Sequence, residues 1–265
     1  MPTLRGSRIR SRAQSRDDHV VRQRARLGPH TVNRIGFGAM QLSGPGVFGP
    51  PADPEAARTV LQRAIELGVD HIDTAQYYGP GTVNRLIREA LHPYPDGLAI
   101  VSKVAARRDA GGTLRRFDEP RELRQGIEEN LATLGVGRLA AVNLRMMDPS
   151  ESPDRRFDAR LAALVRARGD GLIDGIGLSN ISRRHLLRAV DQTEIVCVQN
   201  LFNLADQCFL DVLTECEARG IAFVPFCPLG FPGEKRQRLL GDPVLAAVAA
   251  RLGATCGSTT RPAPS

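Results

Sequence analysis

The sequence has no tryptophan, and aromatic residues make up only 5% of its 265 residues. Leucine, valine, isoleucine and alanine must therefore fill the interior, and a chain of this length that is 42% hydrophobic can fill one large core or two small ones. No stretch approaches the roughly 20 apolar residues of a membrane span, and the N-terminal region has no apolar run of signal-peptide length. We therefore expect a cytoplasmic protein that does not contact a membrane.

The 5 cysteines include no C-x-x-C pair, and the 5 histidines show no spacing typical of metal ligands. An odd number of cysteines also argues against a closed set of disulfides. We expect the cysteines to be small buried residues in a reducing cytoplasm, and we expect no metal site.

The net charge of +7 is distributed unevenly, because residues 1–29 hold eight arginines and two aspartates and so carry +6 of it. The rest of the chain is nearly neutral, which does not favour binding to nucleic acid. We interpret residues 1–29 as a basic extension that is disordered or non-native. Anion binding and targeting by this segment are the alternatives.

Lysine is scarce, since only Lys103 and Lys235 occur among the 36 basic residues. Lys103 follows the apolar run 98–102, where a strand should enter the core. Burial penalises a lysine charge unless a carboxylate pairs with it, and lysine, unlike arginine, has a pKa that its surroundings can tune. An upstream apolar run ends in such a carboxylate, Asp73, and is followed by Tyr78. Together these residues suggest a phenol that is made acidic enough to donate a proton.

Seven short apolar runs have the character of parallel strands that are buried on both faces. They lie at residues 34–40, 71–74, 99–104, 139–144, 173–178, 195–199 and 221–226. Amphipathic helices are predicted between them, and their ends carry recognisable signals. One helix begins after Asp53 and stops at Gly68, another is closed by Gly135, a third follows Ser182, a fourth ends at Gly220 and a fifth covers residues 243–252.

Alternating strands and helices leave two architectures, an open doubly wound sheet and a (β/α)8 barrel. No G-x-G-x-x-G follows a strand, which counts against a dinucleotide-binding open sheet. Polar side chains follow six consecutive runs, as they do at the carboxyl face of a barrel. They are Asp73, Lys103, Arg145, the pair Ser179 and Asn180, Gln199 and Cys227. We therefore predict the α/β class and a (β/α)8 TIM barrel.

No eighth apolar run is present. Residues 254–265 are polar and contain glycine and proline, so they cannot form a central strand. We expect the barrel to lack its eighth strand, with a barrel domain over 30–253 and an irregular tail over 254–265. The abrupt change of composition after Thr255 also suggests a truncated chain.

The spacing Asp73-x4-Tyr78-Gly79, followed by a strand that ends at Lys103, resembles the aldo-keto reductase family. The resemblance covers about residues 32–255. Its motifs are GFGAM at 36–40, IDTA at 72–75, LGV at 134–136, GIGLSN at 175–180, VQN at 198–200 and PFCPLG at 225–230. Each motif is weak alone, but their order and spacing are specific. The resemblance implies that the barrel binds NADP(H) across its carboxyl face and reduces small aldehydes or ketones.

Carried over by position, Tyr78 would be the general acid that protonates the carbonyl oxygen. Lys103 would lower the pKa of this phenol, while Asp73 would keep the lysine charged and oriented. Ser179, Asn180 and Gln199 would hold the nicotinamide carboxamide, and Phe226 would stack on the ring. The remaining residues implied to contact the cofactor are Cys227 and Leu229 at the pyrophosphate and Gly38, Ala39 and Met40 on the opposite side.

Two departures from the family pattern matter. Arg145 stands where the family usually has a histidine, and a guanidinium can stabilise a developing alkoxide but cannot shuttle a proton. A simple salt bridge at the rim is the alternative for Arg145. The family's contacts to the 2′-phosphate follow the eighth strand, so a preference for NADPH over NADH comes from the resemblance alone.

The sequence thus predicts an NADPH-dependent carbonyl reductase without a metal, and it leaves the oligomeric state open. The main alternative is a non-catalytic relative that binds the cofactor as a redox sensor or inactive fragment, although a sensor would not need the acid. A barrel isomerase acting on sugar phosphates would need a glycine-rich phosphate loop, and only residues 228–230 could supply one.

Overall fold

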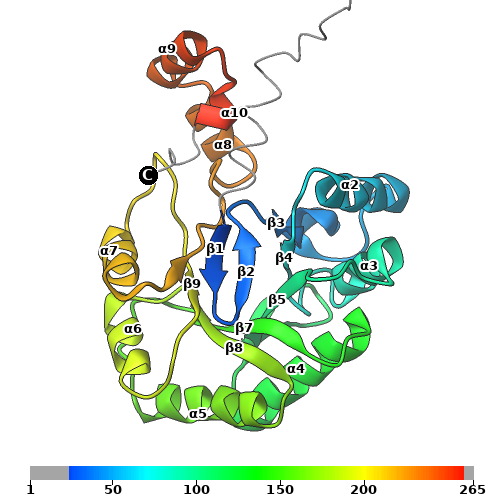
Figure 1. The fold of residues 1–265 in the computed structure, drawn as a ribbon, viewed down its shortest axis with the longest axis vertical. Coiled ribbons are helices and arrows are strands. Elements are labelled where there is room, and N and C mark those ends of the chain that lie inside the picture. The colour runs from blue at the N-terminus through cyan, green and yellow to red at the C-terminus, as the bar shows by residue number, and fades with distance from the viewer. Residues whose placement is uncertain (1–23, 260–265) are drawn as a thin grey trace, which may run out of the picture.

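A computed structural model describes residues 24–259, which form a curled parallel sheet with helices along its outer face (Figure 1). In spatial order the parallel strands are β3 (Phe37–Gly38), β4 (His71–Asp73), β5 (Ala99–Arg108), β7 (Leu139–Arg145), β8 (Ile173–Ser179), β9 (Cys197–Gln199) and β10 (Ala222–Phe223). The helices between them are α2 (Pro54–Glu66), α3 (Thr82–Leu91), α4 (Pro120–Leu134), α5 (Arg155–Gly169), α6 (Arg183–Val190) and α7 (Leu210–Arg219). This is the α/β sheet of a (β/α)8 barrel, as predicted.

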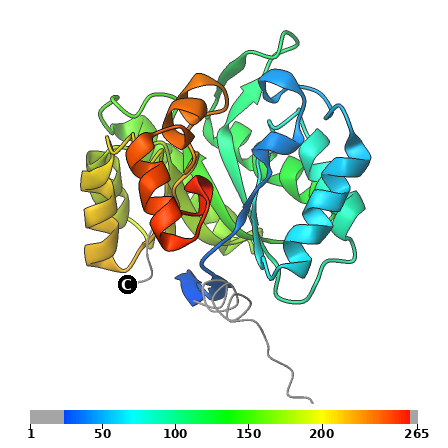
Figure 2. The same cartoon turned by 90° about the horizontal axis from the view of Figure 1, so that it is seen from above.

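The sheet is open between β3 and β10, because no strand within residues 24–259 pairs with their outer edges. Three further helices, α8 (Glu234–Leu240), α9 (Pro243–Leu252) and α10 (Cys256–Thr259), follow β10. They lie on the open side of the sheet, between α7 and α2 (Figures 1 and 2). The prediction that no eighth strand follows the seventh is confirmed for the residues that the structure describes.

The helices form where the sequence carries start and stop signals. The Asp53 carboxylate accepts a hydrogen bond from Ala56 N at 2.9 Å and caps α2. Gly135 ends α4 in the left-handed conformation, with φ of 71°, which glycine adopts without a steric penalty. Leu61 of α2 is fully buried, whereas its neighbour Val60 is 48% exposed.

An antiparallel hairpin of β1 (Arg24–Leu27) and β2 (His30–Asn33) covers the amino-terminal end of the sheet (Figure 1). Leu27 and Val32 point into a small apolar cluster with residues at the starts of several strands, which are Ala99, Val101, Ala140, Ala141, Val196 and Cys197. The hairpin therefore closes one end of the interior.

Polar contacts hold this hairpin to two different parts of the sheet. The backbone N of Asn33 donates to the carboxylate of Asp70, just before β4, at 2.8 Å. On the other side, His30 Nε2 lies 3.0 Å from Oδ2 of Asp174 in β8. The hairpin is thus bonded to the segment that leads into β4 as well as to β8.

Both predicted ends of the barrel domain need correction. Strand β1 lies inside the extension predicted over residues 1–29, and α10 lies inside the irregular tail predicted over residues 254–265. The hairpin was missed because β1 buries only its last residue fully and carries no apolar run. Residues 1–23 and 260–265 lie outside the part of the chain that the structure describes.

Strand β5 continues past the rim of the sheet, further than the predicted strand 99–104. Ala105 has a positive φ of 82°, and beyond it the strand pairs in antiparallel register with β6 (Leu114–Phe117). Lys103 lies before this bend, in register with Asn143 of β7. Figure 2 shows the β5–β6 hairpin at the end of the sheet opposite to the β1–β2 hairpin.

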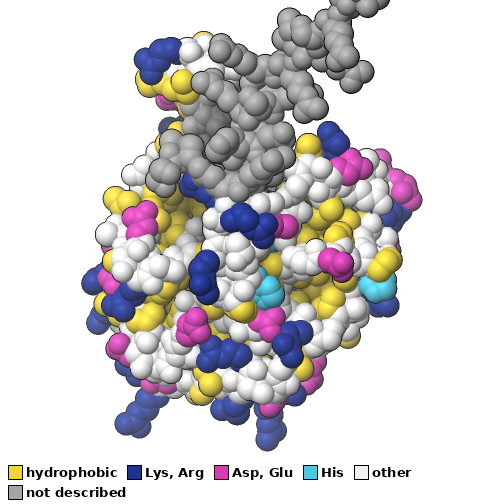
Figure 3. All heavy atoms as spheres, viewed as in Figure 1, with side chains coloured by type: hydrophobic (Ala, Val, Ile, Leu, Met, Phe, Trp, Pro, Cys, Tyr) yellow, Lys and Arg dark blue, Asp and Glu magenta, His cyan; other side chains and the backbone are white. Residues whose placement is uncertain are grey.

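The surface and the cysteines add three observations. Basic and acidic side chains are interspersed on the face that Figure 3 shows. Within residues 24–259, no helix combines the length and the apolar character that a membrane crossing requires. All five cysteines are free, and the described residues include no group of three or more His, Cys, Asp or Glu that could hold a metal ion.

Candidate active site

Strand register fixes the positions of five of the predicted site residues. Gly38 of β3 pairs with Asp73 of β4, Arg145 of β7 pairs with Ser179 of β8, and Ser179 pairs with Gln199 of β9. These residues are the last of their strands, and parallel strands end at the same edge of a sheet. The structure therefore brings them to one rim, as predicted.

The predicted pair of Lys103 and Asp73 is present at this rim. Lys103 Nζ lies 2.5 Å from Asp73 Oδ2 and also donates to the backbone oxygen of Thr74 at 3.2 Å. The same nitrogen lies 5.1 Å from the centroid of the Tyr78 ring. Lys103 is only 4% exposed, so its charge depends on these partners and not on water.

The acidity of Tyr78 differs from the expectation. Burial raises the pKa of the Tyr78 hydroxyl well above its usual value near 10, and the Asp73 carboxylate raises it further. Arg145 and Arg108 lower this pKa but do not outweigh burial. The prediction that the phenol becomes more acidic is therefore wrong in its net direction, because burial of the hydroxyl outweighs the nearby cations. A raised pKa keeps Tyr78 protonated at neutral pH.

A neighbouring loop holds the Tyr78 segment in place. Gly79 N donates to the backbone oxygen of Val47 at 3.2 Å, and a Cβ on Gly79 would come within 2.6 Å of the Gly49 oxygen. The rings of Tyr77 and Tyr78 meet edge to face with centroids 5.3 Å apart. The Tyr77 hydroxyl is buried without a hydrogen-bond partner among the described residues, so this side chain lines the space beside Tyr78.

A buried polar network behind the rim was not predicted from the sequence. Thr74 Oγ1 donates to Asn84 Oδ1 at 2.7 Å, and Asn84 Nδ2 donates to Asn130 Oδ1 at 2.9 Å. Ser102 Oγ donates to the same Asn130 oxygen at 2.6 Å. The network ties β4 and β5, next to Asp73 and Lys103, to α3 and α4 and so fixes the two strand ends. The only signal in the sequence was an asparagine on each otherwise apolar helix face.

Arg145 lies at the end of β7 with few partners. Its Nη1 contacts the Met146 backbone oxygen at 3.3 Å and the Met147 sulfur at 3.0 Å. Within the described part of the chain it forms no ion pair, so the alternative of a rim salt bridge finds no support there. The guanidinium lowers the pKa of Tyr78, which places its charge within electrostatic reach of the phenol.

Ser179, Asn180 and Gln199 form a second group on the rim. Asn180 adopts a positive φ of 55°, its backbone N donates to Gln199 O at 3.0 Å, and its Nδ2 donates to Met146 O at 2.8 Å. Ser179 is 2% exposed and Gln199 is 4% exposed. The side-chain oxygen of Gln199 is buried, and no described residue donates a hydrogen bond to it.

The remaining predicted cofactor residues lie at the two edges of the open sheet. Residues 39 and 40 follow β3, and a Cβ on Gly38, its last residue, would meet nothing within 4 Å. Residues 226–229 follow β10, where Phe226 N donates to Asn200 O at 3.0 Å and Cys227 has a positive φ of 50°. The order of the sheet places five strands between these two segments.

The rim fits a ligand that carries amide donors. The second Asp73 oxygen and the Gln199 side-chain oxygen are buried, and neither accepts a hydrogen bond from any residue within 24–259. Unsatisfied buried acceptors cost free energy, and donors of a ligand would remove that cost. Backbone strain gathers at the same strand ends, since Ala105, Asn180 and Cys227 are three non-glycine residues with positive φ. A nicotinamide carboxamide has the donors that this rim lacks.

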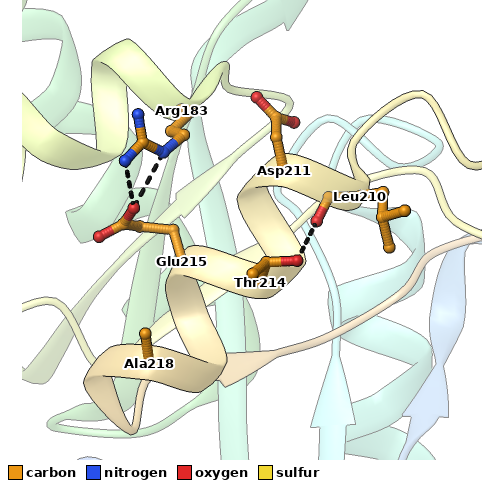
Figure 4. Close-up of a pocket in the computed structure, with 6 residues that line it drawn as sticks. All are labelled: Arg183, Leu210, Asp211, Thr214, Glu215 and Ala218. Atoms are coloured by element: carbon orange, nitrogen blue, oxygen red, sulfur yellow. Dashed lines mark hydrogen bonds and ion pairs between the residues drawn. The ribbon is translucent and has the colours of Figure 1, made fainter.

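A separate hollow lies on the outer surface between α6 and α7 (Figure 4). Arg183 and Glu215 bridge it, with Arg183 Nε 2.9 Å and Nη2 2.7 Å from Glu215 Oε2. Thr214 Oγ1 donates to Leu210 O at 2.9 Å within α7. Arg183, Glu215 and Thr214 are thus engaged with one another or with the helix backbone.

Comparison with known proteins gives consistent sequence matches. The sequence profile of the aldo/keto reductase family matches residues 34–244. Pyridoxine 4-dehydrogenase of Escherichia coli strain K12 is 45% identical over 234 residues, which are 86% of this chain and 79% of that protein. An uncharacterized oxidoreductase of Schizosaccharomyces pombe is 38% identical over 204 residues, which are 77% of this chain and 65% of that protein.

Solved structures show the same fold. A thermostable aldo-keto reductase in complex with the inhibitor epalrestat has a TM-score of 0.71 at 28% identity, covering 88% of this chain and 82% of that one. An aldo/keto reductase from Klebsiella pneumoniae in complex with NADP and acetate has a TM-score of 0.70 at 22% identity, covering 91% and 80%. At that identity the second likeness concerns the fold alone.

Proposed function

Because this chain belongs to the aldo/keto reductase family, we propose that it is an NADPH-dependent oxidoreductase that reduces an aldehyde or ketone to an alcohol. One observation carries the proposal. The buried Lys103 ammonium lies 2.5 Å from Asp73 and 5.1 Å from the centre of the Tyr78 ring, at the strand ends. A barrel that served only as a binding module would have no need of this set.

Residues of the rim would hold the cofactor and orient it. The free acceptor of Gln199, together with Ser179 and Asn180, would hold the carboxamide of the nicotinamide. When bound, the reduced nicotinamide supplies a hydride to the carbonyl carbon. Tyr78 donates its proton to the carbonyl oxygen, and because its pKa is raised, this donation depends on cations that stabilise the phenolate.

The cations of the rim act on the charge that develops during this transfer. The Lys103–Asp73 pair holds an ammonium 5.1 Å from the centre of the Tyr78 ring. Arg145 and Arg108, which lower the pKa of Tyr78, would stabilise the phenolate that remains after proton donation. Among the described residues, the Arg145 guanidinium contacts only the Met146 backbone oxygen and the Met147 sulfur. Its other N–H donors are therefore free for the carbonyl oxygen. It holds the oxygen in place and does not move a proton.

The substrate is a small carbonyl compound. The relative from Escherichia coli is a pyridoxine 4-dehydrogenase, and its identity of 45% makes pyridoxine and the aldehyde formed by oxidation of its 4-position alcohol the first pair to test. A panel of other aldehydes and ketones covers a broader specificity.

The test follows NADPH absorbance with this panel for the parent chain and for Tyr78→Phe. Loss of a general acid should lower the rate about 10²- to 10⁴-fold. Tyr77→Phe is the matched control and should retain the rate within a few-fold, because that hydroxyl is not assigned a proton transfer. A Tyr78→Phe protein that matches the parent rate would refute the assigned acid. Tight cofactor binding without turnover of any carbonyl would favour the non-catalytic alternative.

A further inference from the structure

Arg236 on α8 is a half-buried cation without a partner of opposite charge among residues 24–259. Its Nε is fully buried and has no hydrogen-bond acceptor there. The one side-chain hydrogen bond that it forms within the described residues runs from Nη2 to the Gly230 backbone oxygen, at 3.5 Å the outer limit of a hydrogen bond. A buried guanidinium with unused donors costs free energy, so this group is incomplete without an acceptor.

The guanidinium lies beside the loop that follows β10. A Cβ on Gly230 would come within 3.3 Å of the Arg236 backbone, so the loop and α8 are in direct contact. Gly230 N donates to Cys227 O at 2.9 Å, which folds the loop into a turn at the end of β10. Arg236 also lowers the pKa of the Cys227 thiol, although burial raises that pKa overall. In Figure 2, α8 lies toward the end of the sheet that carries the β5–β6 hairpin.

We propose that Arg236 binds a phosphate group of the nicotinamide dinucleotide, an inference that rests on the proposed function. A guanidinium presents paired N–H donors that match two phosphate oxygens, and it keeps its charge at all relevant pH values. The phosphate would supply the acceptors that Nε lacks.

The two other cations of α8 do not share these features. Lys235 Nζ lies 5.9 Å from the centre of the Phe231 ring, and Arg238 is exposed. Arg238 therefore provides a matched control, since it has the same charge on the same helix but no buried donor.

The test is a calorimetric titration of the purified full chain with NADPH and with NADH. Arg236→Ala should weaken NADPH binding at least about tenfold, since hydrogen bonds to charged groups are stronger than neutral ones. Arg238→Ala should bind as the parent does, and Arg236→Lys should fall between. Weakened binding of both dinucleotides would identify the diphosphate as the group bound, and weakened binding of NADPH alone would identify the 2′-phosphate.

A melting curve without ligand separates binding from a structural role. Arg236→Ala should melt no lower than the parent, because it removes an unsatisfied buried donor and leaves no carboxylate unpaired. A variant that melts lower but binds NADPH with the parent's affinity would overturn the inference. If the parent binds and Arg236→Ala binds equally, only the inference fails. A parent that binds neither dinucleotide refutes the proposed function as well.

Discussion

Replacing Asp73 by asparagine removes one charge of the buried pair without changing the size of the side chain. In the parent, Lys103 Nζ has Asp73 Oδ2 at 2.5 Å and Thr74 O at 3.2 Å. Asparagine leaves the ammonium with neutral acceptors alone. Because Lys103 is only 4% exposed, water cannot replace the lost carboxylate.

The expected loss of stability follows from this burial. Removing one partner of a buried ion pair costs about 3–5 kcal/mol. The Asp73 side chain is 19% exposed, against 6% for Lys103, so the lower end of about 3 kcal/mol applies. For a domain of this size 1 kcal/mol changes the melting temperature by about 2–4 °C. We therefore expect Asp73→Asn to melt about 6–12 °C below the parent.

Thermal melts of the parent, Asp73→Asn, Lys103→Met and the double variant at pH 7 test this reasoning. The double variant should recover most of the lost stability, because a buried pair can be replaced by groups of similar volume without an uncompensated charge. It should remain inactive, which separates the contribution to folding from the contribution to catalysis. A loss below about 1 kcal/mol for Asp73→Asn, or no recovery in the double variant, would refute the reasoning.

Three further outcomes are expected. Burial raises the pKa of Tyr94 to about 12 and also raises those of the other two tyrosines, so the folded state holds protons that the unfolded chain releases near pH 10. Burial also raises the pKa of Cys197 and of Cys216 to about 12, so urea unfolding should show stability that begins to fall near pH 9 and falls more steeply above pH 10. The fall is at most about 1.4 kcal/mol per pH unit for each of these groups, and a flat profile would contradict this. Gly177→Ala should lower the free energy of unfolding by about 1–3 kcal/mol in the same assay, because the added Cβ would lie 1.9 Å from Asn143 Oδ1. Gly137→Ala is the control and should not lower it, because a Cβ there would meet nothing within 4 Å. Arg145→Gln should lower kcat for aldehyde reduction about 10²-fold, and an unchanged kcat would exclude a contact to the carbonyl oxygen.

The accuracy of the predicted strands depends on where each strand lies in the sheet. The runs 139–144 and 173–178 match β7 and β8 to within one residue, since both are flanked by strands and covered by helices. The runs 34–40 and 221–226 shrink to two paired residues each in β3 and β10. These two strands are the edges of the open sheet and have a ladder on one side only. An apolar run records burial, but it does not record whether a neighbouring strand is present.

The candidate site likewise has features that the sequence predicts and features that it does not. The pair of Lys103 and Asp73 was predictable, because a single lysine after an apolar run needs a carboxylate. The acidity of Tyr78 was not, because it depends on how deeply the loop packs beneath its neighbours. The network through Asn84 and Asn130 depends on two helices meeting in space, which a helical pattern does not encode.

The β1–β2 hairpin has a mechanical consequence for ligand entry. It is hydrogen-bonded to Asp70 before β4 and to Asp174 in β8, so it joins two separate strands at the amino-terminal end of the sheet. The hairpin therefore restrains the amino-terminal end of the sheet, whereas the carboxyl ends of the strands, near Tyr78 and Gln199, have no such tie from it. We expect any change in the width of the gap between β3 and β10 to be larger at the carboxyl ends.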